Sequence, residues 1–216
     1  MKNLVFSLCL LSCVIFTSSC KKDKTIIKPS PTSNSDTVLK HLPLKAGNYW
    51  VYELIYVDSF GVEFEHRNEY DTLRIIKDSV VNGNTYYYCS APFRLSFPEL
   101  VRDSMGILVS LYGGIYFKES RQLDTFANHN LDTLYSFSEY VDPGPFMIET
   151  HAGTFNCVRM GRYFYQFHPL FGHMHEEKRH NKSYFARDIG MISNEYSFAT
   201  SEIKWRFKLY DYHLEP

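Results

Sequence analysis

The chain has 216 residues, of which 23 are Lys or Arg and 24 are Asp or Glu, so its formal charge is −1. This balance, without a basic tract, argues against a nucleic-acid-binding protein, because phosphate contacts need clustered Lys and Arg. Aromatic residues make up 17% of the chain, with 17 Tyr and 17 Phe. Disordered proteins are poor in aromatic residues, so this composition excludes a disordered chain. The length fits a folded domain with a sizeable core.

The N-terminus contains the three parts of a secretory signal peptide. Lys2 precedes an apolar run over 4–16, which the small residues 17–19 and then Cys20 follow. The run is shorter than the ~20 residues that a transmembrane helix needs, so a membrane-spanning anchor is the weaker interpretation. The segment SSC at 18–20 resembles a bacterial lipoprotein lipobox. That resemblance implies cleavage before Cys20 and attachment of acyl chains, such as palmitate, to this cysteine. The alternative is an ordinary secretory signal with an incidental Cys20.

The next segment, 20–40, is rich in Lys, Ser, Thr and Pro and has one short apolar pair. This composition is typical of an extended, solvated tether. We therefore expect a signal peptide at 1–19, a lipidated cysteine and tether at 20–40, and a β-rich domain at 41–216. The predicted location is the cell envelope, with a lipid anchor in the outer membrane and the domain facing either the periplasm or the cell surface.

The remaining sequence has the pattern of β-strands. Residues 204–212 alternate apolar and charged side chains, which is the period of a half-buried strand. Asn82-Gly83 between two such runs is a strong hairpin signal, and no window of 11 residues or more carries a helical stripe. We predict an all-β fold, a single antiparallel domain of up-and-down hairpins forming a curved sheet or a barrel. The terminal strand is expected beside the opening strand, with its apolar side chains buried: Trp205, Phe207 and Leu209 against Trp50 and Tyr52.

Three local strings carry a resemblance to known proteins. GNYWVYE at 47–53, AGTFNCVRM at 152–160 and YFARDIGMISNEY at 184–196 occur in the order found in a group of Bacteroidota envelope lipoproteins. The chain resembles that group over about residues 42–213. The resemblance implies a β-rich envelope domain and assigns no catalytic residue.

The two cysteines expected in the mature domain besides Cys20 are Cys89 and Cys157. The envelope permits disulfides, so these two could form a bridge. Both stand in apolar, strand-like runs, where a cysteine also serves as a small buried hydrophobe. The sequence leaves these alternatives open.

Catalytic signatures are sparse. There is no G-x-S-x-G elbow, phosphate loop, dinucleotide fingerprint or H-E-x-x-H motif. We expect no cofactor. Glu53, set among apolar neighbours, is the acid that stands out.

The sharpest candidate for metal chemistry lies in FHPLFGHMHEEKRHNK at 167–182. In an extended segment His173, His175 and Glu177 share one face, and two imidazoles with a carboxylate suit Zn²⁺ or a similar ion. Against this, the neighbouring Pro, Gly and charged residues are typical of a solvated hairpin tip.

Two function classes follow. The favoured one is a binding or scaffold module, attached to the membrane through Cys20, that takes an apolar molecule, a glycan or an envelope partner, because Tyr rings suit wet, partly apolar sites. The alternative is a metal-assisted envelope enzyme using His173, His175 and Glu177. Whether the protein is an enzyme stays uncertain, with binding the more favoured role.

Overall fold

The computed structural model describes residues 40–131, 135–166, 179–198 and 201–216. Within these residues the regular structure comprises twelve strands and η1 (Phe93–Leu95), a short 3₁₀ turn. The predicted all-β class is therefore confirmed. The strands are β1 (Tyr49–Val57), β2 (Glu63–Val81), β3 (Asn84–Ser90), β4 (Leu100–Asp103), β5 (Ile107–Ser110), β6 (Ile115–Lys118), β7 (Asp124–Leu131), β8 (Tyr135–Thr150), β9 (Gly153–Gln166), β10 (Arg179–Ala186), β11 (Gly190–Ser197) and β12 (Lys204–His213).

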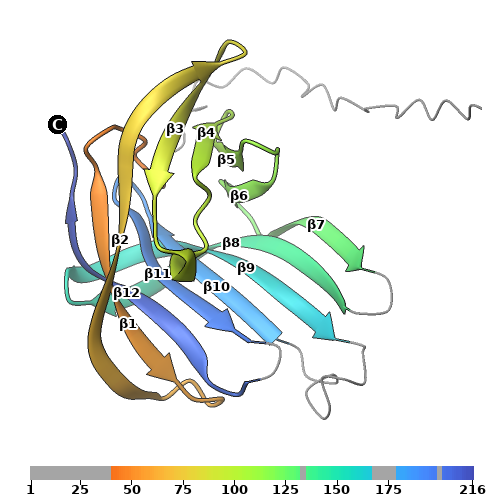
Figure 1. The fold of residues 1–216 in the computed structure, drawn as a ribbon. Helices are drawn as coiled ribbons and strands as arrows, with labels where there is room; N and C mark the ends of the chain where they lie inside the picture. Colours follow the sequence, from red (N-terminus) through yellow and green to blue (C-terminus); the bar gives the residue numbers. More distant parts are fainter. Residues whose placement is uncertain (1–39, 132–134, 167–178, 199–200) are drawn as a thin grey trace, which may run out of the picture. The chain divides into compact units, whose positions relative to one another are not determined.

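All twelve described strands belong to one antiparallel sheet with the order β6-β5-β4-β3-β2-β1-β12-β11-β10-β9-β8-β7 (Figure 1). Neighbours in the sheet are neighbours in the chain, as expected for up-and-down hairpins. The exception is the pair β1 and β12, which lie side by side in the middle of the sheet, as predicted. The sheet is open, with β6 and β7 as its edges. The curved-sheet form of the prediction is therefore right and the barrel form is wrong.

The hairpin between β2 and β3 forms where the sequence predicts it. Asn82 and Gly83 both have positive φ angles, 51° and 77°. A two-residue turn with two positive φ angles matches the right-handed twist of the flanking strands. Asn and Gly are the residues that adopt this conformation most readily.

The core lies on one face of the sheet, here called the inner face. Leu54 of β1 is paired with Phe207 of β12, and Tyr52 with Leu209, and all four side chains are fully buried. Trp205, predicted to be buried with Phe207 and Leu209, is only half-buried. It is the second residue of β12.

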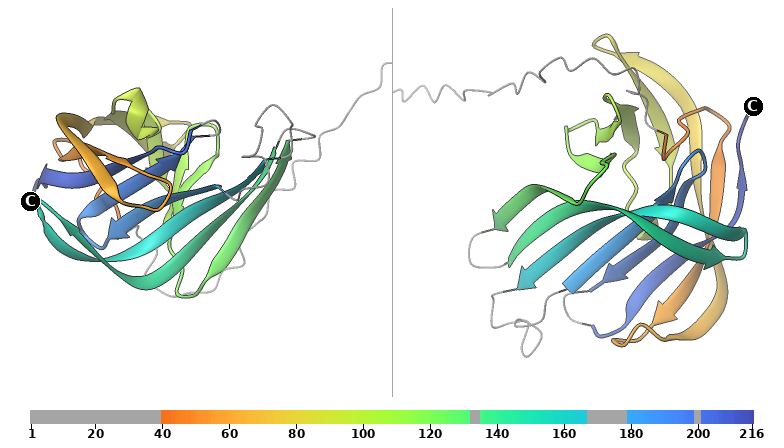
Figure 2. Two further views of the ribbon diagram at one scale, coloured as in Figure 1. Left: turned by 90° about the horizontal axis from the view of Figure 1, so that it is seen from below. Right: turned by 180° about the vertical axis from the view of Figure 1, so that it is seen from behind.

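The sheet curls so that its first half covers the inner face of its second half (Figure 2). The ring of Phe117 on β6 lies 4.4 Å from that of Phe185 on β10. The hydroxyl of Tyr196 on β11 donates a hydrogen bond to the carbonyl oxygen of Leu95 in η1, at 3.3 Å. Both halves thereby contribute to one apolar cluster.

The opposite, outer face carries charged side chains that neutralise one another. Glu63 of β2 accepts from Arg206 at 2.8 Å and from Lys208 at 2.6 Å, and Arg206 also pairs with Glu195 of β11. Burial disfavours the Glu63 carboxylate, but the hydrogen bonds from Lys208 and Arg206 outweigh burial and lower the pKa of Glu63. The predicted charged face of the terminal strand is therefore a paired network.

Candidate ligand-binding cavity

A cavity of about 200 Å³ lies between the inner face of β8–β11 and the segment containing η1 and β6. Most of its lining residues are polar, although they lie on the face that elsewhere holds the apolar core. The lining residues are Ser96, Ile115, Tyr116, Glu139, Met160, Gly161, Arg162, Asn181, Ser183, Asn194 and Tyr196.

The strand register brings together the polar lining residues that β8–β11 contribute to this cavity. Glu139 on β8 is directly opposite Arg162 on β9, and Arg162 is opposite Asn181 on β10. One step along, Ser183 on β10 is opposite Asn194 on β11. Because side chains alternate between faces with a period of two, these residues of four neighbouring strands project to the same side.

The charged groups of the cavity are paired with each other. Arg162 Nε donates to Glu139 Oε1 at 2.8 Å, and its Nη2 contacts the same oxygen. The guanidinium also lies 4.8 Å from the ring centre of Phe137, and the second carboxylate oxygen of Glu139 lies 3.8 Å from Nε2 of His129 on β7. The pair brings no net charge to the cavity.

Two buried polar groups in the lining have no protein partner. They are the hydroxyl of Tyr116 and the amide nitrogen Nδ2 of Asn194. Asn194 is only 1% exposed. The Asn194 amide oxygen is occupied, because it accepts from the Ser183 hydroxyl at 3.1 Å. Burial raises the pKa of Tyr116 well above its usual value, so this phenol remains a neutral hydroxyl. A buried group without a partner costs about 1–3 kcal/mol, and such groups call for water or a ligand.

The roof of the cavity is fixed by ionic and backbone contacts. Arg94 of η1 donates to Asp71 on β2 at 2.8 Å and contacts Glu69. Ser96 ends the turn in a left-handed conformation, with φ of 48°, and its N–H donates to the Phe93 carbonyl at 3.0 Å. These contacts hold η1 over the inner face.

The cavity lies beside the open seam of the sheet. β6 and β7 are consecutive in the chain but are not hydrogen-bonded to each other. Side chains bridge the seam near the connection, where Lys118 Nζ lies 2.5 Å from Asp124 Oδ2 and 5.7 Å from the Phe126 ring centre. Tyr116, at the other end of β6, lines the cavity.

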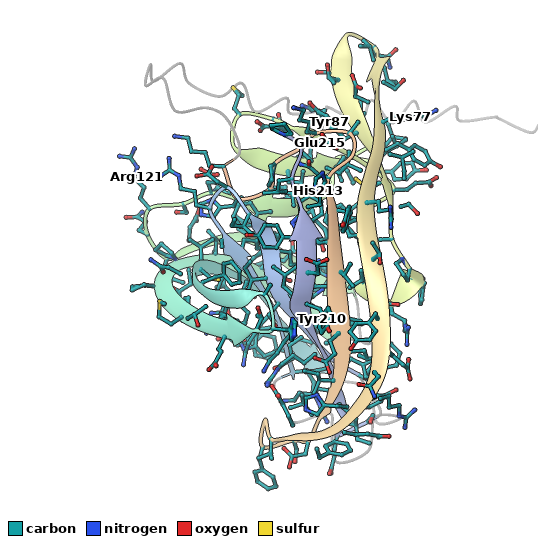
Figure 3. The ribbon with its side chains drawn as sticks, turned by 90° about the vertical axis from the view of Figure 1, so that its left-hand side faces the viewer. Lys77, Tyr87, Arg121, Tyr210, His213 and Glu215 are labelled. Carbon is teal, nitrogen blue, oxygen red and sulfur yellow. The ribbon has the colours of Figure 1, made fainter. Side chains whose placement is uncertain are left out.

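A second hollow, of about 270 Å³, lies at the end of the sheet where the described chain starts and ends. Tyr87 and Glu215, both labelled in Figure 3, line it together with residues 42–45, Asn48 and Asp103. Among the described residues that line it, no buried side-chain polar atom lacks a hydrogen-bond partner. The cavity beside the seam is therefore the stronger candidate site.

The metal-site candidates of the sequence analysis, His173, His175 and Glu177, lie outside the described residues, as does Cys20. Within the residues that the structure describes, no three His, Cys, Asp or Glu side chains are close enough to hold a metal ion. Glu53 lies on the outer face, 3.1 Å from Nδ1 of His66. It is not part of the cavity.

Cys89 and Cys157 are both buried with free thiols. The sequence left open a disulfide bridge or a role as small buried hydrophobic residues, and in the structure the two cysteines have the second role. Burial raises the pKa of each thiol to about 12. Both cysteines therefore remain protonated at neutral pH, consistent with a packing role.

No helix in the described ranges is long and apolar enough to span a membrane. The sequence matches no known protein family, and no curated protein is similar to it at a significant level. The chain is similar in structure to a protein of Bacteroides fragilis described as exported and as having a YmcC-like fold. That protein is 11% identical, with a TM-score of 0.42 over 82% of this chain and 100% of that chain. It is also similar to a protein of Parabacteroides distasonis described as a lipoprotein, at 10% identity and a TM-score of 0.35 over 82% and 99% of the two chains. Likeness at this level does not transfer a function.

Proposed function

We propose that the protein is a cell-envelope lipoprotein, anchored in the outer membrane through acyl chains on Cys20, whose β domain binds a small ligand in the cavity beside the seam. The observation that carries the binding role is the pair of buried, unpartnered groups on Tyr116 and Asn194 that line one cavity. Ligand sites combine a concave surface with a few well-placed polar groups, and this cavity has both.

The state of the cavity's charged groups favours binding over catalysis. A general acid or base needs a pKa near the working pH and access to the substrate proton. The Glu139 carboxylate is held by Arg162, and burial keeps the Tyr116 phenol neutral. These groups are suited to holding a ligand in place by hydrogen bonds.

Blocking the cavity should abolish ligand binding. Ile115 is half-buried in the lining, and Ile115→Trp would fill part of the space; overpacking of this kind costs about 1–3 kcal/mol of stability. We expect at least a roughly tenfold loss of affinity, equivalent to about 1.4 kcal/mol. Saturation-transfer difference NMR on the full-length protein in detergent, with toluene, glucose, glucuronate and putrescine as probes, measures this.

The matched control is Ile203→Trp, the same exchange at an exposed position in the connection between β11 and β12. Because partitioning of a probe into micelles is the same for all three proteins, only a difference between them reports binding. If no probe binds the wild type and the control more strongly than Ile115→Trp, the cavity is not a ligand site.

Anchoring is expected to depend on Cys20. Cys20→Ala removes the thiol that would carry the lipid, and stable membrane attachment depends on acyl chains that each contribute ~0.8 kcal/mol per buried methylene. The variant should therefore leave the detergent phase in Triton X-114 partitioning and lose labelling by an alkynyl palmitate analogue. Cys89→Ala, which leaves the lipobox intact, should keep both properties. Unchanged labelling of Cys20→Ala would contradict the assignment.

A further inference from the structure

We infer that the cavity takes one neutral sugar unit, such as a single hexose residue at the end of a glycan. This inference rests on the proposed binding function and specifies its ligand. Three properties of the cavity carry it: its size, the neutrality of its charged pair, and the kind of hydrogen-bonding group left without a partner.

The size of the cavity sets the scale of the ligand. At about 200 Å³ it exceeds the ~150 Å³ cavity that accommodates benzene. It is smaller than the ~300–1,000 Å³ pockets that enclose drug-sized ligands. One six-membered ring with its substituents suits this volume, whereas a long acyl chain or an oligosaccharide would not be enclosed.

The paired charges disfavour a charged ligand. Glu139 and Arg162 already satisfy each other at 2.8 Å. An anionic ligand would meet the Glu139 carboxylate and a cationic ligand the Arg162 guanidinium, unless the pair separated. The Glu139 side chain is only 7% exposed, so separating the pair would leave a buried carboxylate without its partner, which is strongly unfavourable.

The unpartnered groups disfavour an apolar ligand. The Tyr116 hydroxyl and Asn194 Nδ2 are already buried without a hydrogen-bond partner, and an apolar ligand would leave both groups in that unfavourable state. A sugar hydroxyl both donates and accepts, so one hydroxyl can accept from the Asn194 amide and a second can bond to the Tyr116 phenol. The rings of Tyr116 and Tyr196 and the side chain of Met160 provide apolar surface for the C–H groups of the same sugar.

The test is Tyr116→Phe, which removes one oxygen and leaves the ring. Because that hydroxyl has no protein partner, its removal should leave the urea midpoint unchanged or raise it. Affinity for the preferred sugar should fall about two- to twelvefold, as for one lost hydrogen bond of ~0.5–1.5 kcal/mol. NMR titration of the full-length protein in detergent with glucose, galactose, mannose and N-acetylglucosamine measures this. Glucuronate, glucosamine and toluene serve as charged and apolar counterparts.

Tyr112→Phe, the same exchange at a fully solvated position, should change neither stability nor affinity. If the wild type prefers a charged or apolar probe, and Ile115→Trp blocks binding of that probe, the sugar assignment is wrong but the binding function stands. Unchanged sugar affinity in Tyr116→Phe would do the same. If Ile115→Trp blocks no probe at all, the binding function fails as well.

Discussion

Replacing Trp50 with alanine is expected to lower the free energy of unfolding by about 3–5 kcal/mol, the range for a fully buried aromatic residue. The Trp50 side chain has no exposed surface, and its indole N–H donates to the Ile189 carbonyl oxygen at 2.6 Å. Gly190, with φ of 121°, lies against the indole: a Cβ there would be 2.8 Å from its nitrogen. Alanine would leave a cavity and an unpaired carbonyl group at the same place.

The matched variant is Trp205→Ala, which changes the other of the chain's two tryptophans. Trp205 is half-buried and packs edge-on against Phe198 at 4.7 Å and Tyr56 at 6.5 Å. We expect a loss of about 1–2 kcal/mol, within the range of ordinary destabilising substitutions. Urea unfolding followed by circular dichroism measures both variants. Equal losses, or a larger loss for Trp205→Ala, would show that the burial described for the two rings is wrong.

This contrast shows what a periodic pattern can predict. Alternation along 204–212 correctly assigns Phe207 and Leu209 to the buried face and the basic residues to the other. It cannot predict how far along a strand the covering layer extends. Trp205 has the right parity but lies near a hairpin, so the pattern overestimates its burial.

Partners distant in sequence could not be predicted either. Arg206 bonds to Glu63, 143 residues away, and the register that brings them together depends on β1 between them. The sequence predicts a charged face on the terminal strand, because period two is local. The acids that neutralise that face are known only once the strand order is known.

The cavity was missed for a similar reason, although one signal was present. In 135–141 the alternate positions Tyr135, Phe137 and Val141 form an apolar face, and the position between the last two, Glu139, is an acid. A charged residue within an apolar face is the kind of local inconsistency that marks functional sites. Its partner Arg162 lies on another strand, and the cover over both comes from η1 and β6, so no single segment contains the site.

The edges of the sheet were also beyond the sequence. Placing the last strand beside the first is correct, but this pairing lies in the middle of the sheet. The true edges are β6, with four residues, and β7. Neither has a clear alternation in the sequence, and a short edge strand is one way that proteins limit edge-to-edge association.

Removing the terminal strand is expected to prevent folding altogether. β12 is hydrogen-bonded to β1 on one side and β11 on the other, and Figure 3 shows it alongside β1. A chain that ends at Asn194 would lose the last three residues of β11 and all of β12, including Phe207 and Leu209, which are fully buried. The sheet would be divided into two halves without backbone pairing between them.

Each half of the divided sheet would expose a long new edge and much of the inner face. Such edges pair readily with other chains, so we expect the truncated protein to accumulate in the insoluble fraction. A chain that ends at Leu214 is the control, because it keeps β12 and the packing of Leu214 against the core and should remain soluble with an unchanged β spectrum. The comparison is the soluble fraction after expression together with circular dichroism. A soluble, cooperatively unfolding protein that ends at Asn194 would show that β12 is not the strand that joins the two halves of the sheet.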